Sequence, residues 1–451
     1  MGKSGKAYLI IMAVLIALVV ITNSDWFQGD AEDPGSTADP VTVTTAATPT
    51  LAPTKKPVVV TKKPTVPAVK PATPTPVPAT PTPKPATPTP VPKVNLFAGY
   101  DIPQYRTMYT KLTPVAQRIY RELRECIVYD TKSCIIWDVD YKTYANQVGI
   151  AQEALLYDFP EFFWISRGWS SKSVSENGRG GIRITPTLRS YWTKLSNREQ
   201  HIAAVMDRAK EVANAAMSRY SSAYDQLKYI NDWICRNTTY NTAAAETNKS
   251  ENRPEEHLYA FSAYGVFVRK SAVCQGYALA FKLIANMCGY PCEYVSGEGN
   301  GGDHGWNYVT VNGKSYWMDV TWNDRDGGMS GAVCRYTYFL VSSKYFCRDH
   351  IVDDTNFTAP VCNDNSMDFF SRNLAHFTQY DFAAINASVK KQIAVDDLVH
   401  LRFENRELMD MAVQYLFGEP KQWRQLDIGA YKNVTYYRDY DQLVISIKFK
   451  A

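Results

Sequence analysis

The chain has 451 residues and a formal net charge of +4 at pH 7. The small excess of positive charge owes much to lysines in a proline-rich N-terminal stretch, so composition gives no indication of a nucleic-acid-binding protein. About 355 residues follow that stretch, enough for one large domain or two smaller ones.

An apolar run at residues 7–21 follows Lys3 and Lys6 and precedes several acidic residues. The positive-inside rule directs everything after such a run out of the cytoplasm. Because no clear Ala-x-Ala cleavage site follows, we predict that residues 1–24 are a single-pass signal anchor in the cell membrane. The alternative is a cleaved export signal and a secreted protein, and both readings predict an extracellular C-terminal part.

Proline, threonine, alanine, valine and lysine dominate the chain from about residue 33 to residue 93, which includes near-repeats of PATPTPVP. Such a composition cannot build a packed core and favours an extended polyproline II conformation. We predict that residues 25–96 are a disordered linker, long enough to carry a domain across a thick Gram-positive cell wall. Its lysines either contact anionic wall polymers or only keep the tether solvated.

The segment after the linker resembles a mainly helical region. Apolar residues recur at helical spacing in residues 113–126 and 197–220, whereas residues 133–138 and 181–185 resemble strands. We therefore predict a mainly helical N-terminal extension, with a few strands, over residues 97–221.

A helix is predicted to begin at Cys274, in the segment SAVCQGYALAFKLIANMCG. Gly289 is a suitable C-cap, and the residues that recur at helical spacing are Tyr277, Ala280, Leu283, Ile284 and Met287. At a helix N-terminus, the dipole and a neighbouring imidazole stabilise the thiolate, the form of cysteine that attacks a carbonyl. The backbone N–H groups of Gln275 and Gly276 lie in the first turn and are free to face an oxyanion.

A β-hairpin is predicted with strands at residues 304–311 and 314–322, because the Asn-Gly pair between them is the strongest two-residue turn signal. If the two residues that flank the turn pair with each other, His304 and Asp319 become diagonal neighbours. Their Cα atoms are then roughly 7 Å apart, a separation that a side-chain hydrogen bond can close. One face of the hairpin carries His304, Trp306, Tyr308, Asp319 and Thr321.

The order Cys274, His304, Asp319 is that of a cysteine nucleophile, a general base and an acid that orients the base. Simpler readings exist for Cys274, as a buried thiol or half of a disulfide, and for Asp319, as a solvated strand residue. Apolar residues flank Asp319 on both sides, which makes an unpartnered carboxylate costly and favours a partner. We therefore predict that the three residues form a catalytic triad.

Three separated motifs resemble the core of the transglutaminase-like superfamily, a papain-related cysteine fold: VCQGYA, HGWN and WMDVTWND. Upstream, KYINDWICRNTTYN resembles the helix and loop that lead into that core. The resemblance implies Cys274 as nucleophile, His304 as general base and acid, and Asp319 as the residue that fixes the imidazole tautomer. It also implies an α+β, papain-like core over residues 222–345, in which the cysteine-bearing helix packs on an antiparallel sheet bearing the histidine and the aspartate.

Many members of that superfamily stabilise the oxyanion with an upstream tryptophan or a similar side chain, and no such residue aligns clearly in this chain. The candidates are Trp164, Trp169, Tyr264 and Gln275. Trp306 and Trp322 are either core residues or walls of the catalytic cleft.

After the predicted core, residues 399–403 resemble a strand, residues 405–417 a helix capped by Asn405, and residues 443–449 an alternating strand. These patterns predict a small α+β extension over residues 346–451. The extension carries no chemical motif, so substrate presentation and simple packing are both open.

The nine cysteines fit one reactive thiol and up to four disulfides in an exported chain. The pairs closest in sequence are Cys126 with Cys134, Cys288 with Cys292, and Cys334 with Cys347. A zinc site is disfavoured because paired C-x-x-C clusters are absent, and we predict neither a metal nor another cofactor. The ligands of such a zinc site would be Cys288, Cys292, Cys347 and His350.

Together these predictions describe an extracytoplasmic cysteine enzyme that forms a thioester from an amide substrate, most simply to hydrolyse peptide or amide bonds at the cell surface. Two alternatives remain open: an acyltransferase that cross-links glutamine side chains to amines, and a non-catalytic binding module with the same cleft. The expected partners are the membrane and a peptide or protein substrate, cell-wall-associated proteins included, but not nucleic acid.

Overall fold

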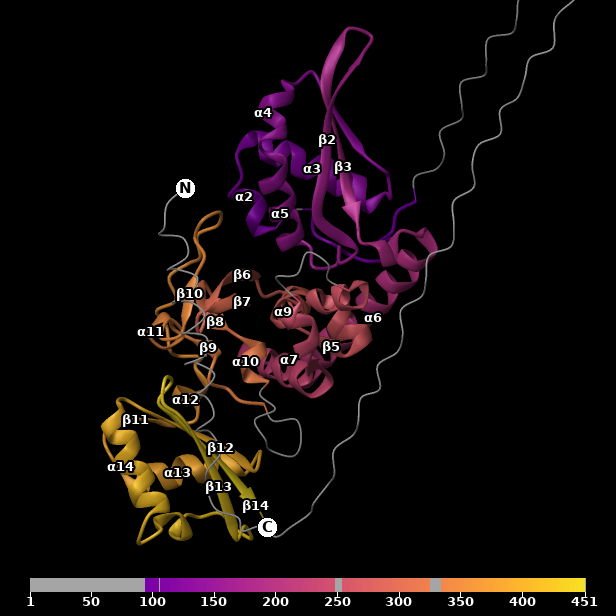
Figure 1. The fold of residues 1–451 in the computed structure, drawn as a ribbon. Helices are drawn as coiled ribbons and strands as arrows, with labels where there is room; N and C mark the ends of the chain where they lie inside the picture. The colour runs from indigo at the N-terminus through magenta and orange to yellow at the C-terminus, as the bar shows by residue number, and fades with distance from the viewer. Residues whose placement is uncertain (1–93, 105, 248–253, 325–333, 451) are drawn as a thin grey trace, which may run out of the picture. The chain divides into compact units, whose positions relative to one another are not determined.

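The computed structural model describes residues 94–104, 106–247, 254–324 and 334–450 (Figure 1). The predicted signal anchor and nearly all of the predicted linker lie outside these ranges. Within them, no helix is both long enough and apolar enough to cross a membrane. Helices and β-sheets alternate along the described chain, so the fold is mixed α and β, as predicted.

The N-terminal extension combines helices with a three-stranded antiparallel sheet of order β1-β3-β2. Its elements are α2 Thr107–Thr110, α3 Pro114–Val128, β1 Cys134–Trp137, α4 Tyr141–Ala145, α5 Val148–Asp158, β2 Ile165–Glu176, β3 Arg179–Leu188, η2 Ser190–Trp192 and α6 Leu195–Arg219. The sequence pattern misses β2, because most of its side chains are exposed and show no apolar alternation.

The central segment packs helices on a five-stranded antiparallel sheet of order β10-β6-β7-β8-β9. Its helical elements are α7 Ala223–Asn237, α8 Thr242–Glu246, η3 Glu255–Phe261, η4 Gly265–Arg269, α9 Cys274–Met287, α10 Val320–Asn323 and α11 Ser343–Phe346. Its strands are β4 Thr239–Tyr240, β5 Ser271–Ala272, β6 Cys292–Gly299, β7 Gly302–Val311, β8 Lys314–Met318, β9 Phe339–Val341 and β10 His350–Val352. Helix α9 packs against β6 and β7, which is the predicted arrangement of a cysteine-bearing helix on an antiparallel sheet (Figure 1).

Both faces of this sheet are buried. One face contributes Val309 and Met318 to the main hydrophobic core, which α9 shares. The other face carries Trp306, Tyr308 and Trp317, which form a smaller cluster with residues of α11 and the loops around it. Cover on both sides explains why β7 and β8 contain runs of buried residues instead of a clean alternation.

The core sheet continues beyond residue 345, where the sequence pattern places the end of the core. Strand β10 pairs antiparallel with β6, and His350 lies opposite Gly299 in that ladder. The segment that follows the predicted boundary therefore supplies one edge of the sheet.

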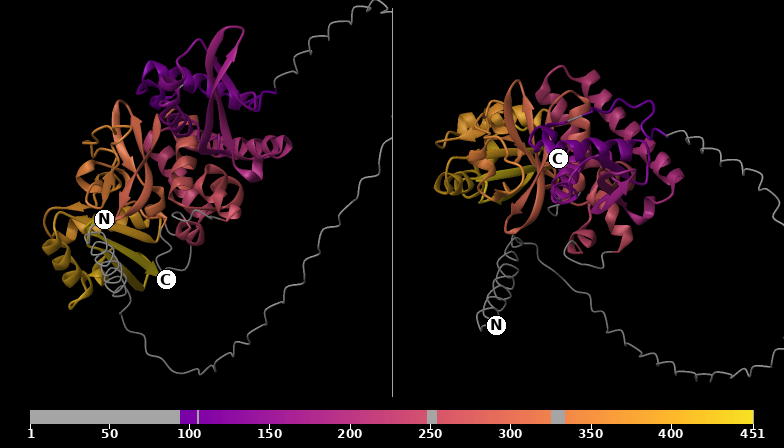
Figure 2. Two further views of the ribbon diagram at one scale, coloured as in Figure 1. Left: turned by 45° about the horizontal axis from the view of Figure 1, so that its top comes forward. Right: turned by 90° about the horizontal axis from the view of Figure 1, so that it is seen from above.

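The C-terminal extension contains a four-stranded sheet of order β11-β12-β14-β13, in which only the β11–β12 pair is parallel. Helices α13 and α14 pack against β12 (Figure 1, Figure 2). The elements are α12 Phe369–Arg372, β11 His376–Phe377, α13 Phe382–Ile393, β12 Leu398–Phe403, α14 Arg406–Phe417, η5 Gln422–Gln425, β13 Asn433–Asp439 and β14 Val444–Lys450. The predicted strands at 399–403 and 443–449 and the helix capped by Asn405 are confirmed.

Candidate active site

Cys274 is the first residue of α9, as predicted, and follows an extended Val273. This position sets its sulfur near the positive end of the helix dipole. Gly276 shows how tightly other segments enclose the helix start. A Cβ at this position would lie 2.5 Å from the carbonyl oxygen of Ala260 and 2.8 Å from the Cβ of Ala272, so only glycine fits between η3, β5 and the first turn.

The hairpin register is the predicted one, since Val311 pairs with Lys314. The second strand, however, ends at Met318, so the prediction that it continues to residue 322 is wrong. Asp319 instead caps the short helix α10, where its Oδ1 atom accepts a hydrogen bond from the backbone N–H of Trp322 at 3.1 Å. An aspartate favours this position because its side chain satisfies a helical N–H that has no other partner.

His304 and Asp319 meet as predicted, although Asp319 lies just beyond the end of β8 and not in the predicted strand pairing. The Nε2 atom of His304 is 2.7 Å from Oδ2 of Asp319, and the two side chains are only 7% and 1% exposed. Because Nε2 is engaged with the carboxylate, Nδ1 is the ring nitrogen available to the Cys274 thiol, which adjoins the ring. The structure thus brings thiol, imidazole and carboxylate together in that order.

The charges in this group support one another. Burial lowers the pKa of His304, but the Asp319 carboxylate and the Cys274 sulfur raise it more, to about 10. Burial likewise raises the pKa of Asp319, yet the imidazoles of His304 and His350 hold it well below its usual range. At neutral pH the pair is therefore an imidazolium facing a carboxylate, and an imidazolium in this place can stabilise a thiolate.

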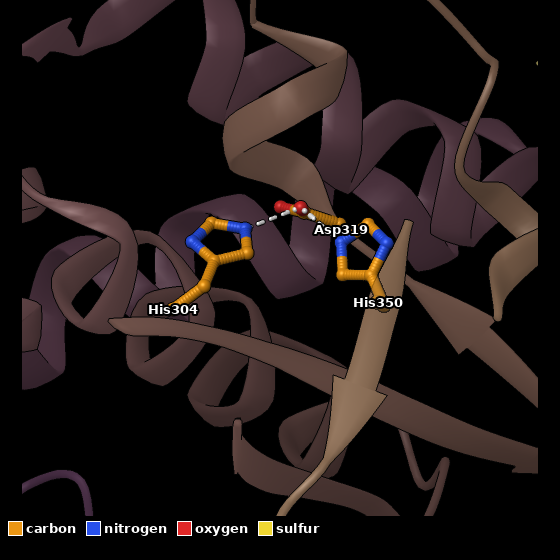
Figure 3. Close-up of side chains that lie close together, drawn as sticks. All are labelled: His304, Asp319 and His350. Carbon is orange, nitrogen blue, oxygen red and sulfur yellow. Dashed lines mark hydrogen bonds and ion pairs between the residues drawn. The ribbon is translucent and has the colours of Figure 1, made fainter. Parts of the chain in front are cut away.

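A second imidazole contacts the same carboxylate (Figure 3). The Nε2 atom of His350 is 3.2 Å from Oδ2 of Asp319, and its Nδ1 atom is 2.6 Å from Oδ1 of Asp349. From the sequence, His350 is indicated only as a ligand of a disfavoured zinc site. No local pattern could place it beside Asp319, because β10 reaches the site through a long-range pairing with β6.

A family model described as the transglutaminase-like superfamily matches residues 210–322, a range that contains all three predicted triad residues. The chain carries a transglutaminase-like domain. The kyphoscoliosis peptidase of Mus musculus is 25% identical over 196 residues, which cover 40% of this chain and 28% of that protein. The kyphoscoliosis peptidase of Homo sapiens is 24% identical over 188 residues, which cover 38% and 27%.

The chain therefore spans less than a third of the length of these curated relatives. Among solved structures, a crystal structure of a TGase is similar over 39% of this chain and 48% of its own, at 20% identity and a TM-score of 0.27. The residues matched by the family model include α7, α9 and the β7–β8 hairpin, which carry the sequence motifs described above.

Aromatic rings enclose the imidazoles of the transglutaminase-like domain. Trp322 stacks on His304, with ring centroids 4.9 Å apart and an angle of 23° between the planes. It is half-buried and covers the side chain that bonds to Asp319, so it walls the site and limits access of water. Trp306 contacts both imidazoles but is completely buried, so the cleft-wall reading of this residue is wrong and the core reading is right.

Tyr240 is a further residue beside Cys274, and the sequence motifs do not indicate it. Strand β4 pairs in parallel with β5, which sets Tyr240 opposite Ala272, two residues before Cys274. Tyr240 is 36% exposed, and its partial burial, with the nearby Cys274 and Asp319, raises the pKa of its phenol, so the phenol stays protonated and can donate a hydrogen bond. The sequence signal that could have found it is its place in KYINDWICRNTTYN, a segment with the family resemblance.

The upstream oxyanion candidates lie elsewhere. Trp164 is 1% exposed and packs among phenylalanine rings of the N-terminal extension, and Tyr264 stacks on Phe163 at 5.4 Å. Trp169 is 42% exposed on β2. Large rings in such clusters fill hydrophobic space, so the structure assigns Trp164 and Tyr264 to packing and Trp169 to an exposed strand face. Gln275 is the predicted candidate that does line the neighbouring cleft.

This cleft has a volume of about 540 Å³ and adjoins the first turn of α9. Its walls come from α5, β2, the end of β3, η3 and α9, so the N-terminal extension supplies much of it. Most lining side chains are aromatic or aliphatic. Its charged side chains are Arg167 and Arg189, and no acidic side chain occurs among the described residues that line it. Apolar walls with two cations suit a peptide that carries an acidic group.

The ligand atoms of His304, Asp319 and His350 lie within 4.8 Å of one another, so these residues are candidates to hold a metal ion. Their Nε2 and Oδ2 atoms, however, are already 2.7 and 3.2 Å apart, which are direct hydrogen-bond distances. Ligands around a tetrahedral zinc ion lie roughly 3.4 Å apart. A hydrogen-bonded chain therefore describes the group better. Among the described residues, Cys288, Cys292, Cys347 and His350 do not form such a group of ligand atoms.

All nine cysteines lie within the described ranges and are free thiols, so the expected disulfides are not formed in this structure. Cys126 and Cys134 are nevertheless hydrogen-bonded neighbours, one on α3 and the other on β1. The candidate pair of Cys334 with Cys347 is not favoured by the structure, because Cys334 lies beside Cys235 of α7 and Cys347 is exposed. Closeness in sequence therefore indicated the neighbours Cys126 and Cys134 but not the neighbours Cys235 and Cys334, which are distant in sequence.

Proposed function

We propose that the chain is a cysteine enzyme in which Cys274 attacks an amide carbonyl and forms a thioester acyl-enzyme, and that it hydrolyses peptide or amide bonds. The observation that carries this proposal is the 2.7 Å contact between His304 and Asp319, with the Cys274 sulfur adjoining the same imidazole. A buried imidazolium beside a thiol at a helix N-terminus supports the thiolate, which is the nucleophile.

In the first step the Cys274 thiolate adds to the amide carbonyl carbon, and an electron pair moves onto the oxygen. His304 donates its Nδ1 proton to the leaving amine, the C–N bond breaks and a thioester remains. The neutral imidazole then takes a proton from water, and the water oxygen attacks the thioester. The C–S bond breaks, the carboxylic acid leaves, and the thiolate and the imidazolium are restored.

The remaining residues assist these steps without exchanging protons. The free backbone N–H groups at the start of α9 and the hydroxyl of Tyr240 are the proposed donors to the oxyanion. Asp319 remains a carboxylate because its pKa is depressed, so it orients His304 and stabilises the imidazolium. The cleft beside Gln275 is the proposed site of the acyl donor.

The purified chain and a Cys274→Ala variant can be compared on a library of internally quenched peptides, with a fluorescent primary amine present. Cleavage by the wild type alone supports hydrolysis, whereas covalent incorporation of the amine supports the acyltransferase. Cys347→Ala removes an exposed thiol and is the matched control, expected to behave like the wild type. Equal results for wild type and Cys274→Ala, with Cys274 alkylated no faster than Cys347, would leave only a non-catalytic binding module.

We also propose that the enzyme acts outside the cytoplasm, anchored in the cell membrane by residues 1–24 and extended by the linker at residues 25–96. The support is the sequence pattern of lysines, apolar run and Pro/Thr-rich stretch. Peptides and proteins of the cell surface, including those of the cell wall, are then the accessible substrates. Proteinase K added to intact cells should degrade the full chain, and protection until lysis would contradict this location.

A further inference from the structure

A continuous line of hydrogen-bonded ionisable groups leads away from the proposed catalytic imidazole. It runs from His304 through Asp319 and His350 to Asp349, with separations of 2.7, 3.2 and 2.6 Å (Figure 3 shows the first three residues). The four side chains are 7%, 1%, 0% and 4% exposed. Because unpaired buried charge is costly, such a group requires a definite pattern of protons.

The donors and acceptors determine that pattern. An ionised carboxylate only accepts hydrogen bonds, and both ring nitrogens of His350 face carboxylate oxygens. Both nitrogens must then carry a proton, which makes the ring a cation. The charges alternate from His304 to Asp349 and sum to zero within the group. Burial lowers the pKa of His350, but the bonds to Asp319 and Asp349 raise it above the ordinary value.

We propose that His350 is a positioning residue for the reaction at Cys274: held as an imidazolium between Asp319 and Asp349, it fixes the Asp319 carboxylate against His304 and balances its charge. The proposal rests on the proposed function but concerns a residue outside the triad. His350 donates to the same Oδ2 atom that His304 uses, so Asp319 is held from two sides and has less tendency to take the His304 proton.

Aromatic rings hold His350 in place. Phe346 stacks on it with centroids 3.9 Å apart, and Trp322 and Tyr338 lie at 4.4 and 5.1 Å. Ring faces attract a cation, and their apolar surface strengthens the hydrogen bonds they enclose. The titratable or charged residues that surround the ring are Asp319, Asp349, His304 and Tyr338, with Arg348 two residues earlier in the chain turned onto the ring of Tyr345.

The far end of the line reaches the C-terminal extension. Oδ2 of Asp349 accepts hydrogen bonds from the hydroxyl of Tyr338 at 2.6 Å and from Nε2 of Gln442 at 2.8 Å. Gln442 is completely buried and lies between β13 and β14. The extension, which has no chemical motif of its own, therefore supplies the last partner of the line that begins at His304.

The charge on His350 can be measured directly in the wild-type chain. The chain has six histidines, so ¹⁵N-histidine labelling gives few signals, and those of His350 are assigned by elimination with Gln variants of the histidines outside the site. Both nitrogens of His350 should be protonated at neutral pH, which is above the ordinary histidine pKa. A His350 nitrogen without a proton at neutral pH would overturn the proposal.

The effect on the reaction is tested with His350→Gln and with the double variant His350→Gln/Asp349→Asn. The single variant leaves the Asp349 carboxylate without its cation, whereas the double variant replaces both charges by amides that can bond to each other. The readout is the rate of alkylation of Cys274 by iodoacetamide against pH, followed by peptide mapping, which needs no known substrate. Thermal unfolding is measured on the same samples.

A purely structural role predicts that the double variant regains both the stability and the pH profile of the wild type. The positioning role predicts that the double variant regains the stability of the wild type. It also predicts that the alkaline limb of the alkylation profile, which reports loss of the His304 proton, shifts to higher pH. The two imidazole centroids are 5.6 Å apart. Removal of a repelling cation at that distance should shift the limb by about one pH unit or more.

His376→Gln is the matched control, since His376 bonds to Glu404 at 3.0 Å outside the site and should leave the profile unchanged. Rapid alkylation of wild-type Cys274 with an unshifted profile in the stable double variant overturns the role of His350 and leaves the proposed function intact. Alkylation of wild-type Cys274 no faster than that of the exposed Cys347 overturns both.

Discussion

The carboxylate of Asp319 accepts hydrogen bonds from two imidazoles and from a helix N-terminus at once. Most of its lone-pair sites are therefore occupied in a fully buried position. A residue so placed has little freedom to rotate, and neither does the His304 ring that it holds. The position of the imidazole beside the Cys274 thiol thus depends on the carboxylate of Asp319.

Asp319→Asn should be one of the most damaging substitutions in the site. It removes the anion that raises the pKa of His304 and introduces an N–H donor that faces other donors. We expect kcat to fall by about 10³ to 10⁴-fold, as for an orienting aspartate in a triad. The measurement is cleavage of the best peptide from the library, and a loss below about tenfold would contradict the orienting role.

The imidazoles should also make stability depend on pH. The folded-state pKa values of His304 and His350 lie above the unfolded value of 6.5. Groups of this kind stabilise the fold fully below the unfolded pKa, and the contribution is lost as pH rises through the folded pKa. The free energy of unfolding should therefore decrease from about pH 6.5 to about pH 10. Urea unfolding at several pH values checks this, and the decrease should be smaller in His304→Gln.

Single residues were predictable from the sequence where local pattern decides their position. Cys274 follows from helical spacing, and the hairpin register brings Asp319 within reach of His304 although Asp319 lies just past the end of β8. His350 and Tyr240 were not predictable, because each reaches the site through a pairing between segments distant in the sequence.

At the scale of elements, the start of α9 has no space for an additional methyl group. Gly276→Ala would press a Cβ against backbone and side-chain atoms of neighbouring segments. We expect a loss of about 1–3 kcal/mol in the free energy of unfolding and slower alkylation of Cys274, because the first turn must shift. Gly180→Ala, which has open space around its Cβ position, is the control and should change neither quantity appreciably.

The cleft that we propose for the acyl donor is lined in large part by the N-terminal extension, which would then help to choose the substrate. Arg167→Gln should raise KM about tenfold or less for peptides with an acidic residue near the scissile bond and leave kcat unchanged, because it removes one of two cations from the lining. Arg179→Gln serves as control, since Arg179 is exposed and paired with Asp138. An equal effect on neutral and acidic peptides would contradict a charge-selective cleft.

Element ends show where local rules suffice. The C-cap of α9 is Cys288, one residue before the predicted Gly289. Gly289 follows it with a φ of +85°, and the N–H of Tyr290 donates to the carbonyl of Ala285 at 3.0 Å, so the glycine does end the helix, from the position after the cap. The end of β8 was misplaced because apolar residues continue past Met318 while the capping tendency of Asp319 breaks the ladder. A capping preference outweighed apolar alternation there.

At the scale of the whole molecule, two pairs of thiols are neighbours and could form disulfides that leave Cys274 free. Oxidised glutathione should join Cys126 to Cys134 and Cys235 to Cys334, each pair losing two electrons to the reagent, because these sulfurs are neighbours. Mass mapping under non-reducing conditions identifies the bonds. Finding Cys334 joined to Cys347 instead would contradict the arrangement of α7 against the segment around Cys334.

The fold class and the order of segments were predictable, because helical and strand periods are properties of short windows. The extent of the core was not. Its sheet recruits β10 from beyond residue 345, and burial of both sheet faces depends on segments that no window contains. The contribution of the N-terminal extension to the cleft was not predictable for the same reason, because it depends on contacts between segments distant in the sequence.

Strand β10 also decides how this chain can be divided. A fragment that stops at residue 345 would keep Cys274, His304 and Asp319 and would retain the whole stretch matched by the family model. It would nevertheless lack the outer strand of the sheet and the second imidazole on Asp319. The shortest piece worth expressing therefore runs through Lys450, because Gln442, the last partner of the buried charge, lies between β13 and β14, and β14 pairs with both β12 and β13. The limit of a working unit thus lies well beyond the last recognisable motif.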